Sequence, residues 1–154
     1  MIHRHVLAPA TPDLPAADKR PVRTPALWGL VVGGLQAASP LAFWWLDAST
    51  VYALGLALIA SIYIGFAVAD GRPAVIAVEG TVAGVFVVVA AAAVTGSPWL
   101  LILGLAAHGL KDLWQHRHQF VANTRWWPPF CLVVDWVAAT IIIIEIIAGV
   151  DFHG

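Results

Sequence analysis

Five long apolar runs, separated by short polar breaks, are the feature that most limits what this 154-residue chain can fold into. Each run is close to the 20 or so residues that a helix needs to cross the hydrocarbon layer of a bilayer. A soluble core has little use for so much apolar surface, since 60% of the residues are hydrophobic and only 11% are charged. The sequence therefore predicts an all-α integral membrane protein, a bundle of five transmembrane helices.

The breaks between the apolar runs have the chemistry of helix ends. "LDAST", "DGRP" and "TGSP" contain Asp, Gly and Pro, and "RHQFVANTRWWPP" is the one long connection. The predicted spans are 26–46, 50–69, 73–95, 98–116 and 129–150. They form one membrane domain over residues 26–150. A Pro- and Ala-rich tail over residues 1–25, which we expect to be disordered, precedes it, and a short outer tail, 151–154, follows it.

Lysine and arginine fall on one side of this predicted domain. With five crossings, all eight lie in the N-terminal tail, in the second connection, or in the fourth connection and the helix end that leads into it. Basic residues are retained in the cytoplasm during insertion. We therefore expect the N-terminus in the cytoplasm and the C-terminus outside, in a bacterial inner (plasma) membrane.

Composition also limits the partners. The formal net charge of −1 offers no basic surface to a polyphosphate backbone, so we expect no nucleic-acid partner. Cys131 is the only cysteine, which rules out an internal disulfide, and in an apolar helix we expect it to pack rather than react. The expected partners are the lipid bilayer, a small lipophilic ligand and other membrane subunits.

Several titratable residues lie inside the predicted spans, where a charge costs about 2.5–3.5 kcal/mol on insertion scales. A rise of about 1.5 Å per residue places four of them roughly 6–12 Å from the cytoplasmic end of their helices. These four are Glu79 in the third span, His108 and Asp112 in the fourth, and Asp135 in the fifth. His116 lies at the mouth of this layer, and Glu145 lies near the outer face. The sequence therefore predicts a polar site in the cytoplasmic half of the membrane.

Small residues are expected to let the helices approach one another closely around this site. The small residues concerned are Gly29 and Gly33 in the first span, Ala57, Ser61 and Gly65 in the second, and Gly80 and Gly84 in the third.

The layer of acids and imidazole suits two kinds of binding or catalytic chemistry. Three acids at one depth repel one another unless they are protonated, paired or bound to a metal. A mixed nitrogen and oxygen site for a divalent metal such as Zn, Fe or Mn can be built from His108, Asp112, Glu79 and Asp135. For acid–base catalysis on a lipid-soluble substrate, the candidate catalytic residues are Glu79, Asp112 and Asp135, and the candidate ligand-binding residues are His108 and His116.

Interpretations without catalysis stay open beside these. The same residues can form a proton relay, or they can fix helix packing in an accessory subunit of a larger membrane complex. Asp112 can extend to the interface, His116 and His118 can form a solvated helix end, and His108 can be a hydrogen-bonded packing residue. We therefore expect a metal- or ligand-binding membrane protein, with enzyme activity left undecided.

The stretches "YIGFAVADGRP", "HGLKDLWQHR" and "WWPPFCLVVDW" together resemble a family of small, uncharacterised bacterial multi-span integral membrane proteins, over about residues 60–140. The resemblance implies one recurring pattern, made of Asp70, His108, Asp112, His116 and Asp135, and it implies no activity. Lys111 departs from the pattern, which favours an apolar or aromatic residue there. The carboxylate layer is also similar in type to those of small membrane isomerases and terpene cyclases, a likeness of fold alone.

Overall fold

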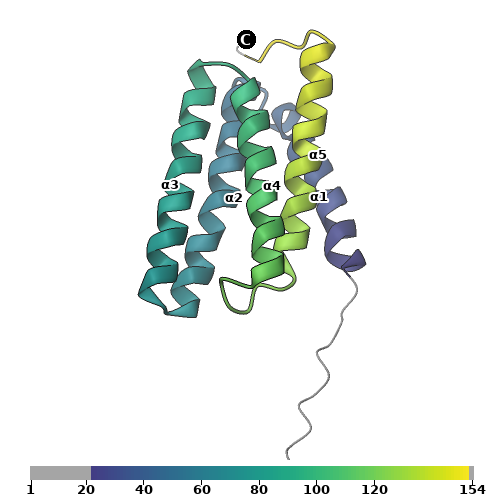
Figure 1. The fold of residues 1–154 in the computed structure, drawn as a ribbon. Helices are drawn as coiled ribbons and strands as arrows, with labels where there is room; N and C mark the ends of the chain where they lie inside the picture. Colours follow the sequence, from purple (N-terminus) through teal and green to yellow (C-terminus); the bar gives the residue numbers. More distant parts are fainter. Residues whose placement is uncertain (1–21, 153–154) are drawn as a thin grey trace, which may run out of the picture.

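The computed structural model describes residues 22–152, which form five α-helices and no strand. Successive helices run in opposite directions along the bundle (Figure 1). The helices are α1 (Arg23–Ala42), α2 (Ala48–Asp70), α3 (Pro73–Thr95), α4 (Trp99–His118) and α5 (Trp127–Ile147). The prediction of an all-helical chain is confirmed. Most of the predicted N-terminal tail lies outside the described residues.

The helix ends follow the chemistry of the breaks. Gly71 ends α2 in the left-handed conformation, with φ of 80°, and its N–H donates to the carbonyl of Ala67. Pro73 opens α3, where the missing N–H leaves no helical hydrogen bond unmade. A helix tolerates proline in its first turn for the same reason. The helix α5 can therefore begin at Trp127, two residues before its predicted start, with both following prolines in its first turn.

The first helix differs most from its predicted bounds. It begins at Arg23 and ends at Ala42, so residues 43–46, predicted to be helical, form a turn instead. The C-terminal segment also differs from a free tail. Phe152 is buried against Tyr52, with ring centroids 6.1 Å apart, and its carbonyl accepts a hydrogen bond from the N–H of Ser49. The segment after α5 is thereby attached to the start of α2.

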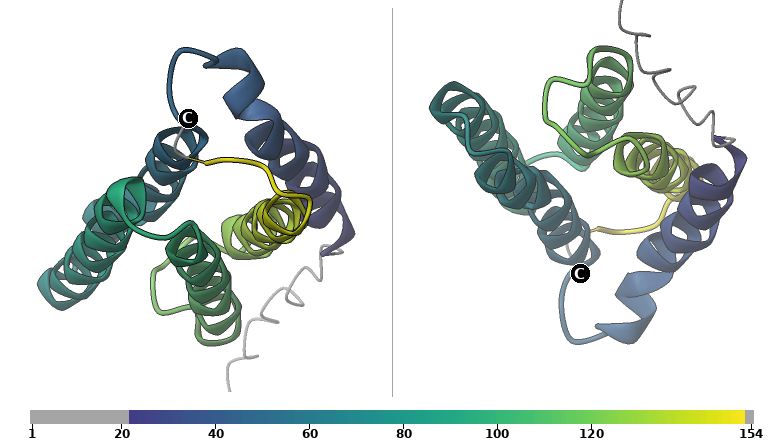
Figure 2. Two further views of the ribbon diagram at one scale, coloured as in Figure 1. Left: turned by 90° about the horizontal axis from the view of Figure 1, so that it is seen from above. Right: turned by 90° about the horizontal axis from the view of Figure 1, so that it is seen from below.

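The helices are arranged side by side around a shared interior, as the two end views show (Figure 2). In these views α1 lies against α5, α5 against α4, and α2 against α3, in agreement with the extensive contacts between these pairs. The interior beyond mid-bundle is apolar, and α2, α3, α4 and α5 all contribute to it. The half of the bundle nearer the α4–α5 loop contains the buried polar residues described below.

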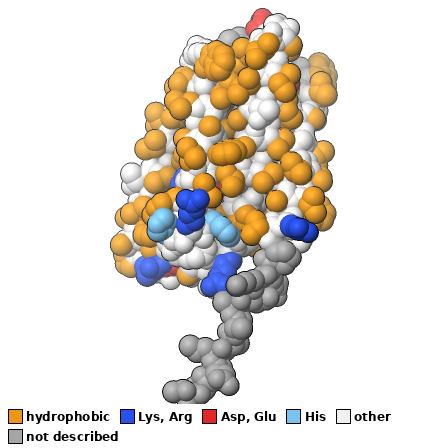
Figure 3. Space-filling view, turned by 45° about the vertical axis from the view of Figure 1, so that its right-hand side comes forward, with side chains coloured by type: hydrophobic (Ala, Val, Ile, Leu, Met, Phe, Trp, Pro, Cys, Tyr) orange, Lys and Arg blue, Asp and Glu red, His pale blue; other side chains and the backbone are white. Residues whose placement is uncertain are grey.

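Three of the helices, α2, α3 and α5, are long and apolar enough to cross a membrane. Hydrophobic side chains cover the flank of the bundle, and Lys and Arg side chains gather toward the lower end (Figure 3). By the same measure α1 and α4 fall short, and α4 contains three charged residues, Lys111, Asp112 and Arg117. Lys111 and Asp112 are directed into the bundle, where they are largely enclosed.

The predicted role of glycine in close helix approach is confirmed at Gly29 and Gly33 in α1 and is wrong at Gly65, Gly80 and Gly84. A Cβ on Gly29 would lie 2.7 Å from the carbonyl oxygen of Phe130 and 2.7 Å from Cβ of Val133, both in α5. Gly33 is enclosed by α5 in the same way. The other predicted glycines, Gly65, Gly80 and Gly84, face away from neighbouring helices, with no atom within 4 Å of an added Cβ.

Replacing Gly29 by alanine is expected to lower the free energy of unfolding by about 1–3 kcal/mol, because the methyl group must push α1 away from the α5 backbone. Gly34→Ala is the matched control in the same helix, since its Cβ would meet nothing within 4 Å. Alanine favours helix by up to about 1 kcal/mol, so the control should be neutral or stabilising. Unfolding in mixed detergent micelles, followed by circular dichroism, measures both variants. Equal stability of the two would contradict the close α1–α5 approach.

Candidate metal centre

Two neighbouring helices bring together one histidine and two aspartates. His108 and Asp112 are one turn apart on the inner face of α4, and Asp135 lies on the side of α5 that faces them. His108 Nδ1 lies 2.8 Å from Asp135 Oδ2 and 3.4 Å from Asp112 Oδ2. All three side chains are at most 1% exposed, and one potential ligand atom from each lies within 4.8 Å of the others. We call these three residues the HDD cluster.

The carboxylates of the HDD cluster keep free lone pairs. Neither oxygen of Asp112 has a hydrogen-bond partner among the described residues, and Oδ1 of Asp135 has none either. The Tyr63 hydroxyl is close enough to Asp112 to interact with it electrostatically, but without the geometry of a well-formed hydrogen bond. Buried polar atoms left without partners are costly. Oxygen and imidazole nitrogen are ligands for Zn, Fe and Mn, so the cluster has the donor set of a mixed metal site.

A buried ion pair lies beside the HDD cluster. Lys111 Nζ in α4 lies 2.7 Å from Glu79 Oε2 in α3, and 3.1 Å from the centroid of the Tyr63 ring in α2. The Glu79 side chain is 2% exposed and that of Lys111 is 14% exposed. The cation is thus held by a carboxylate and by an aromatic face, two interactions that strengthen away from water.

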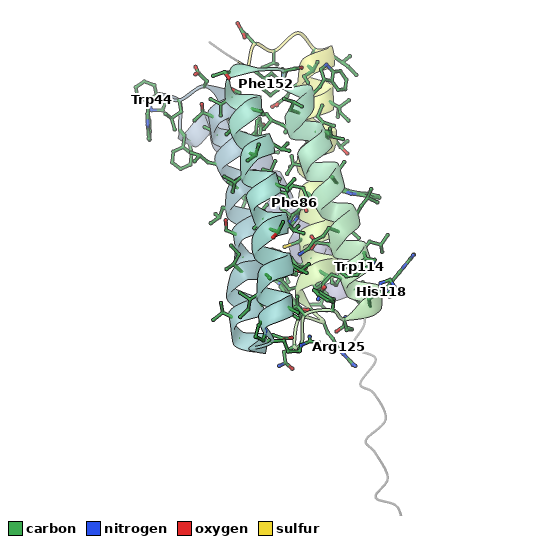
Figure 4. The ribbon with its side chains drawn as sticks, turned by 60° about the vertical axis from the view of Figure 1, so that its left-hand side comes forward. Trp44, Phe86, Trp114, His118, Arg125 and Phe152 are labelled. Atoms are coloured by element: carbon green, nitrogen blue, oxygen red, sulfur yellow. The ribbon has the colours of Figure 1, made fainter. Side chains whose placement is uncertain are left out.

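Aromatic rings surround the imidazole of the HDD cluster. The ring centroid of His108 lies 5.0 Å from that of Phe86 and 6.1 Å from that of Tyr63, both edge to face. Figure 4 shows Phe86 about midway along the bundle. The thiol of Cys131, 1% exposed, is near enough to the two aspartates to interact with them electrostatically. Cys131 is thus buried, as a packing residue would be, and it lies at the edge of the HDD cluster.

The structure brings together three of the residues that the sequence placed in one layer. Glu79 is the fourth, and it pairs with Lys111 instead of joining the HDD cluster. His116 lies in the last turn of α4, outside the cluster, with a buried Nδ1. His118 is exposed and stacks on Trp114 at the same helix end (Figure 4). The interpretation that Asp112 extends to the interface is wrong, because Asp112 is fully buried.

Two neighbours of the site, Tyr63 and Lys111, are only weakly indicated by the sequence. Tyr63 lies about 9 Å from the end of the second predicted span, the depth of the acidic layer, so the same count of helical rise finds it. Lys111 flanks the polar face of α4, and its direction toward Glu79 depends on how α3 is rotated. In the half of the bundle farther from the α4–α5 loop, Glu145 accepts a hydrogen bond of 3.0 Å from the Tyr52 hydroxyl.

A second polar group joins the α2–α3 turn to the α4–α5 loop. Arg72 donates to Asp70 through Nε and Nη2, at 2.6 and 2.7 Å, and to the carbonyl of Phe120 at 2.6 Å. The N–H of Ala122 donates to Asp70 Oδ2 at 2.7 Å. The paired carboxylate raises the pKa of Arg72 above its ordinary value, so the guanidinium stays charged. We call Asp70 and Arg72 the clasp.

Two apolar grooves lie on the outside of the bundle, away from the HDD cluster. One, of about 420 Å³, is lined by residues of α5: Leu132, Val133, Trp136, Val137, Thr140 and Ile141. The other, of about 310 Å³, lies between the start of α1 and Val133. Asp135 belongs to the opposite, buried face of α5. These grooves therefore give a lipophilic ligand no direct contact with the cluster.

Neither a protein-family model, nor a curated protein, nor a solved structure matches this chain. The family resemblance proposed from the three sequence stretches therefore stays a prediction. The function has to be inferred from the geometry of the HDD cluster and its neighbours.

Proposed function

We propose that this protein is a five-span membrane protein that binds one divalent metal ion through His108, Asp112 and Asp135. The observation that carries the proposal is the convergence of three buried ligand atoms within 4.8 Å, with three carboxylate oxygens left without hydrogen bonds. Charge supports it. With every acid ionised and His108 neutral, Glu79 and Lys111 cancel and the two aspartates remain uncompensated. One divalent cation would neutralise them.

Three protein ligands leave part of the coordination sphere of a metal open, which is typical of catalytic rather than structural sites. An open position allows the ion to polarise a carbonyl or activate a water molecule. The Tyr63 hydroxyl and the Lys111 ammonium both interact with Asp112, so each is placed to donate a proton or to stabilise a negative charge beside it. We therefore assign the site to metal-assisted acid–base chemistry on a small molecule.

A proton relay is the second candidate, and one contact favours it. His108 Nδ1 lies between the two aspartates, at 2.8 and 3.4 Å, so a proton on this nitrogen has an acceptor on either side. The metal site requires a bound metal ion in the active protein, whereas the proton relay requires none. A metal-free protein with full activity would favour the relay.

The metal proposal is tested by stripping the purified protein with a chelator and adding Zn²⁺, Mn²⁺ or Fe²⁺ separately. One of these ions is expected to restore about one metal per chain and to raise the Tm. A ligand that binds only the folded state at 100 times its Kd stabilises that state by about 2.7 kcal/mol. Mg²⁺, which prefers all-oxygen sites, is the control ion. If none of the three ions binds, the metal proposal is wrong.

The five crossings and their orientation are part of this proposal. Exposed large apolar side chains occur on α1 and α4 as well as on the three longest apolar helices, including Leu35 at 67% and Leu103 at 63%. Aqueous exposure of this much apolar surface on every helix would be unfavourable, whereas lipid accepts it. Four of the five described basic residues, Arg23, Arg72, Arg117 and Arg125, lie toward one end of the bundle, and the fifth, Lys111, lies inside the same half.

Tags at the two chain ends are therefore expected to report opposite compartments, the N-terminal tag in the cytoplasm and the C-terminal tag outside. The positive-inside rule predicts which end is cytoplasmic, and an odd number of crossings puts the two ends on opposite sides of the membrane. A reporter that is active only outside the cytoplasm, fused in turn to each end, measures this. Detection of both ends in one compartment would contradict five crossings.

A further inference from the structure

Unpartnered buried polar atoms lie on only one side of the HDD cluster, among the residues that the structure describes. Outside the cluster they are Tyr63 Oη, Gln115 Oε1, His116 Nδ1, Trp127 Nε1 and the ion-paired Glu79 Oε2. Gln115 and His116 lie one turn beyond Asp112, toward the α4–α5 loop. In the other direction, the buried face of α4 continues with Leu105 and Leu101. Among the described residues, a water molecule or hydrated cation would therefore find unpartnered buried polar atoms only from the loop side.

The loop itself covers this side. Residues 119–126 connect α4 to α5 next to the α2–α3 turn (Figure 1). Within them Val121 is fully buried and packs in one cluster with Tyr63, and Thr124 is 1% exposed. Gln115 Nε2 donates to the carbonyl of Val121 at 3.1 Å and to Thr124 Oγ1 at 3.0 Å. The loop therefore closes directly over Gln115 and over the ring that contacts His108.

The clasp fastens this loop to another part of the chain. Arg72 holds the carbonyl of Phe120, and Asp70 holds the N–H of Ala122, so both bonds join the α2–α3 turn to the loop. The Arg72 side chain is 57% exposed and the Asp70 side chain is 1% exposed, so the clasp lies at the boundary between the surface and the interior. A loop held by a few bonds of this kind opens locally at a lower cost than the packed helices do.

We propose that residues 119–126 are a gate through which water and a hydrated divalent cation reach the HDD cluster, and that the clasp holds the gate shut. The identity of the cation rests on the proposed function. The opening of the gate does not, because water would enter along Gln115 and His116 whether or not a metal is bound.

The chain contains its own reporter of this opening. Cys131 is the only cysteine, it is 1% exposed, and it lies near Asp112 and Asp135. A small, positively charged methanethiosulfonate is added to membrane vesicles that expose the loop side, and the rate of Cys131 modification is measured. In Asp70→Asn the rate is expected to rise about tenfold or more, the effect of losing one charge-assisted hydrogen bond.

Arg125→Gln is the matched control, since Arg125 is an exposed cation of the same loop (Figure 4) and is not part of the clasp. Its rate should equal that of the wild type. Vesicles that expose the opposite side separate local opening from unfolding, because an unfolded chain loses its sidedness. An unchanged rate in Asp70→Asn, an equal rise in Arg125→Gln, or an equal rise from both sides would overturn the gate.

A second measurement links the gate to the metal. Protein loaded with Zn²⁺ is mixed with excess chelator, and the release rate is expected to rise about tenfold in Asp70→Asn, with unchanged metal content before mixing. If the wild-type protein binds no Zn²⁺, Mn²⁺ or Fe²⁺, the proposed function fails and the Cys131 rates still decide on the gate. If metal binds but neither rate changes, the gate fails and the proposed function stands.

Discussion

Replacing Asp135 by asparagine is expected to lower the metal content of the purified protein from about one ion per chain to a small fraction of that. Asparagine keeps the shape of the side chain and removes the charge that a divalent ion needs. Even changes in groups that only orient metal ligands cost about 10–100-fold in affinity. Loss of a ligand in a three-residue site should cost about 100-fold or more. Elemental analysis of protein purified without added metal measures the loss.

Glu145→Gln is the matched control for this prediction. Glu145 is an acid of the same helix, but it lies in the half of the bundle farther from the α4–α5 loop, where it accepts a hydrogen bond from Tyr52. Glutamine can still accept that bond, so the variant should fold and keep its metal. Full metal occupancy in Asp135→Asn would show that the HDD cluster is not the binding site.

The Tm of Asp135→Asn is a second test, because the substitution is expected to change the Tm in opposite directions without and with bound metal. In the stripped protein, two buried carboxylates face each other across His108, and removing one charge should raise the Tm. In the loaded protein, the same change removes a metal ligand and should lower the Tm. A substitution that merely disturbs packing would lower both. The reversal of sign therefore distinguishes a metal ligand from a structural aspartate.

The helices could be predicted because their limits have local causes. The length of the apolar runs and the turn residues Gly71, Pro73 and Pro98 determine where α2, α3 and α4 begin or end, within a few residues. The end of α1 could not be predicted, because residues 43–46 are as apolar as the helix before them. The turn there depends on where the chain must reverse to reach α2, which is a tertiary requirement.

The sequence also predicts the convergence of the HDD cluster, because its three residues lie at a similar depth along their helices. His108 and Asp112 share a face because they are four residues apart, and helical rise places Asp135 near their level. Depth does not determine how a helix is rotated about its axis. Since α3 is apolar on every side, its sequence leaves open whether Glu79 faces His108 or Lys111. The same uncertainty explains why the predictions for Gly80 and Gly84 are wrong.

The bonds of the clasp to the α4–α5 loop could not be predicted from the sequence, for a different reason. Asp70 and Arg72 are two residues apart, so their ion pair is unsurprising, but their bonds to Phe120 and Ala122 span about 50 positions of sequence. Those bonds need the path of the α4–α5 loop, and no periodicity describes a loop. The family resemblance included Asp70 in its pattern without a role, and the clasp supplies a structural one.

Replacing Lys111 by methionine should destabilise the protein by about 3–5 kcal/mol, although it introduces an apolar residue of the kind that the predicted family resemblance favours at this position. Methionine fills similar volume, so the loss comes from charge. Glu79, 2% exposed, would keep a carboxylate without its cation inside the bundle. Removing one partner of a buried ion pair typically costs this much because the other charge stays buried.

The Lys111–Glu79 pair is expected to respond unequally to its two single substitutions. Glu79→Gln leaves a lysine that is 14% exposed, whose long side chain can extend toward the surface, and which keeps the face of Tyr63. This variant should lose less stability than Lys111→Met. The double variant, Lys111→Met with Glu79→Gln, contains no unpaired charge at this position and should recover most of the loss. Unfolding in mixed micelles measures all four proteins. If the double variant were as unstable as Lys111→Met alone, packing rather than the buried charge of Glu79 would be the cause, and the ion pair beside the HDD cluster would have no energetic role.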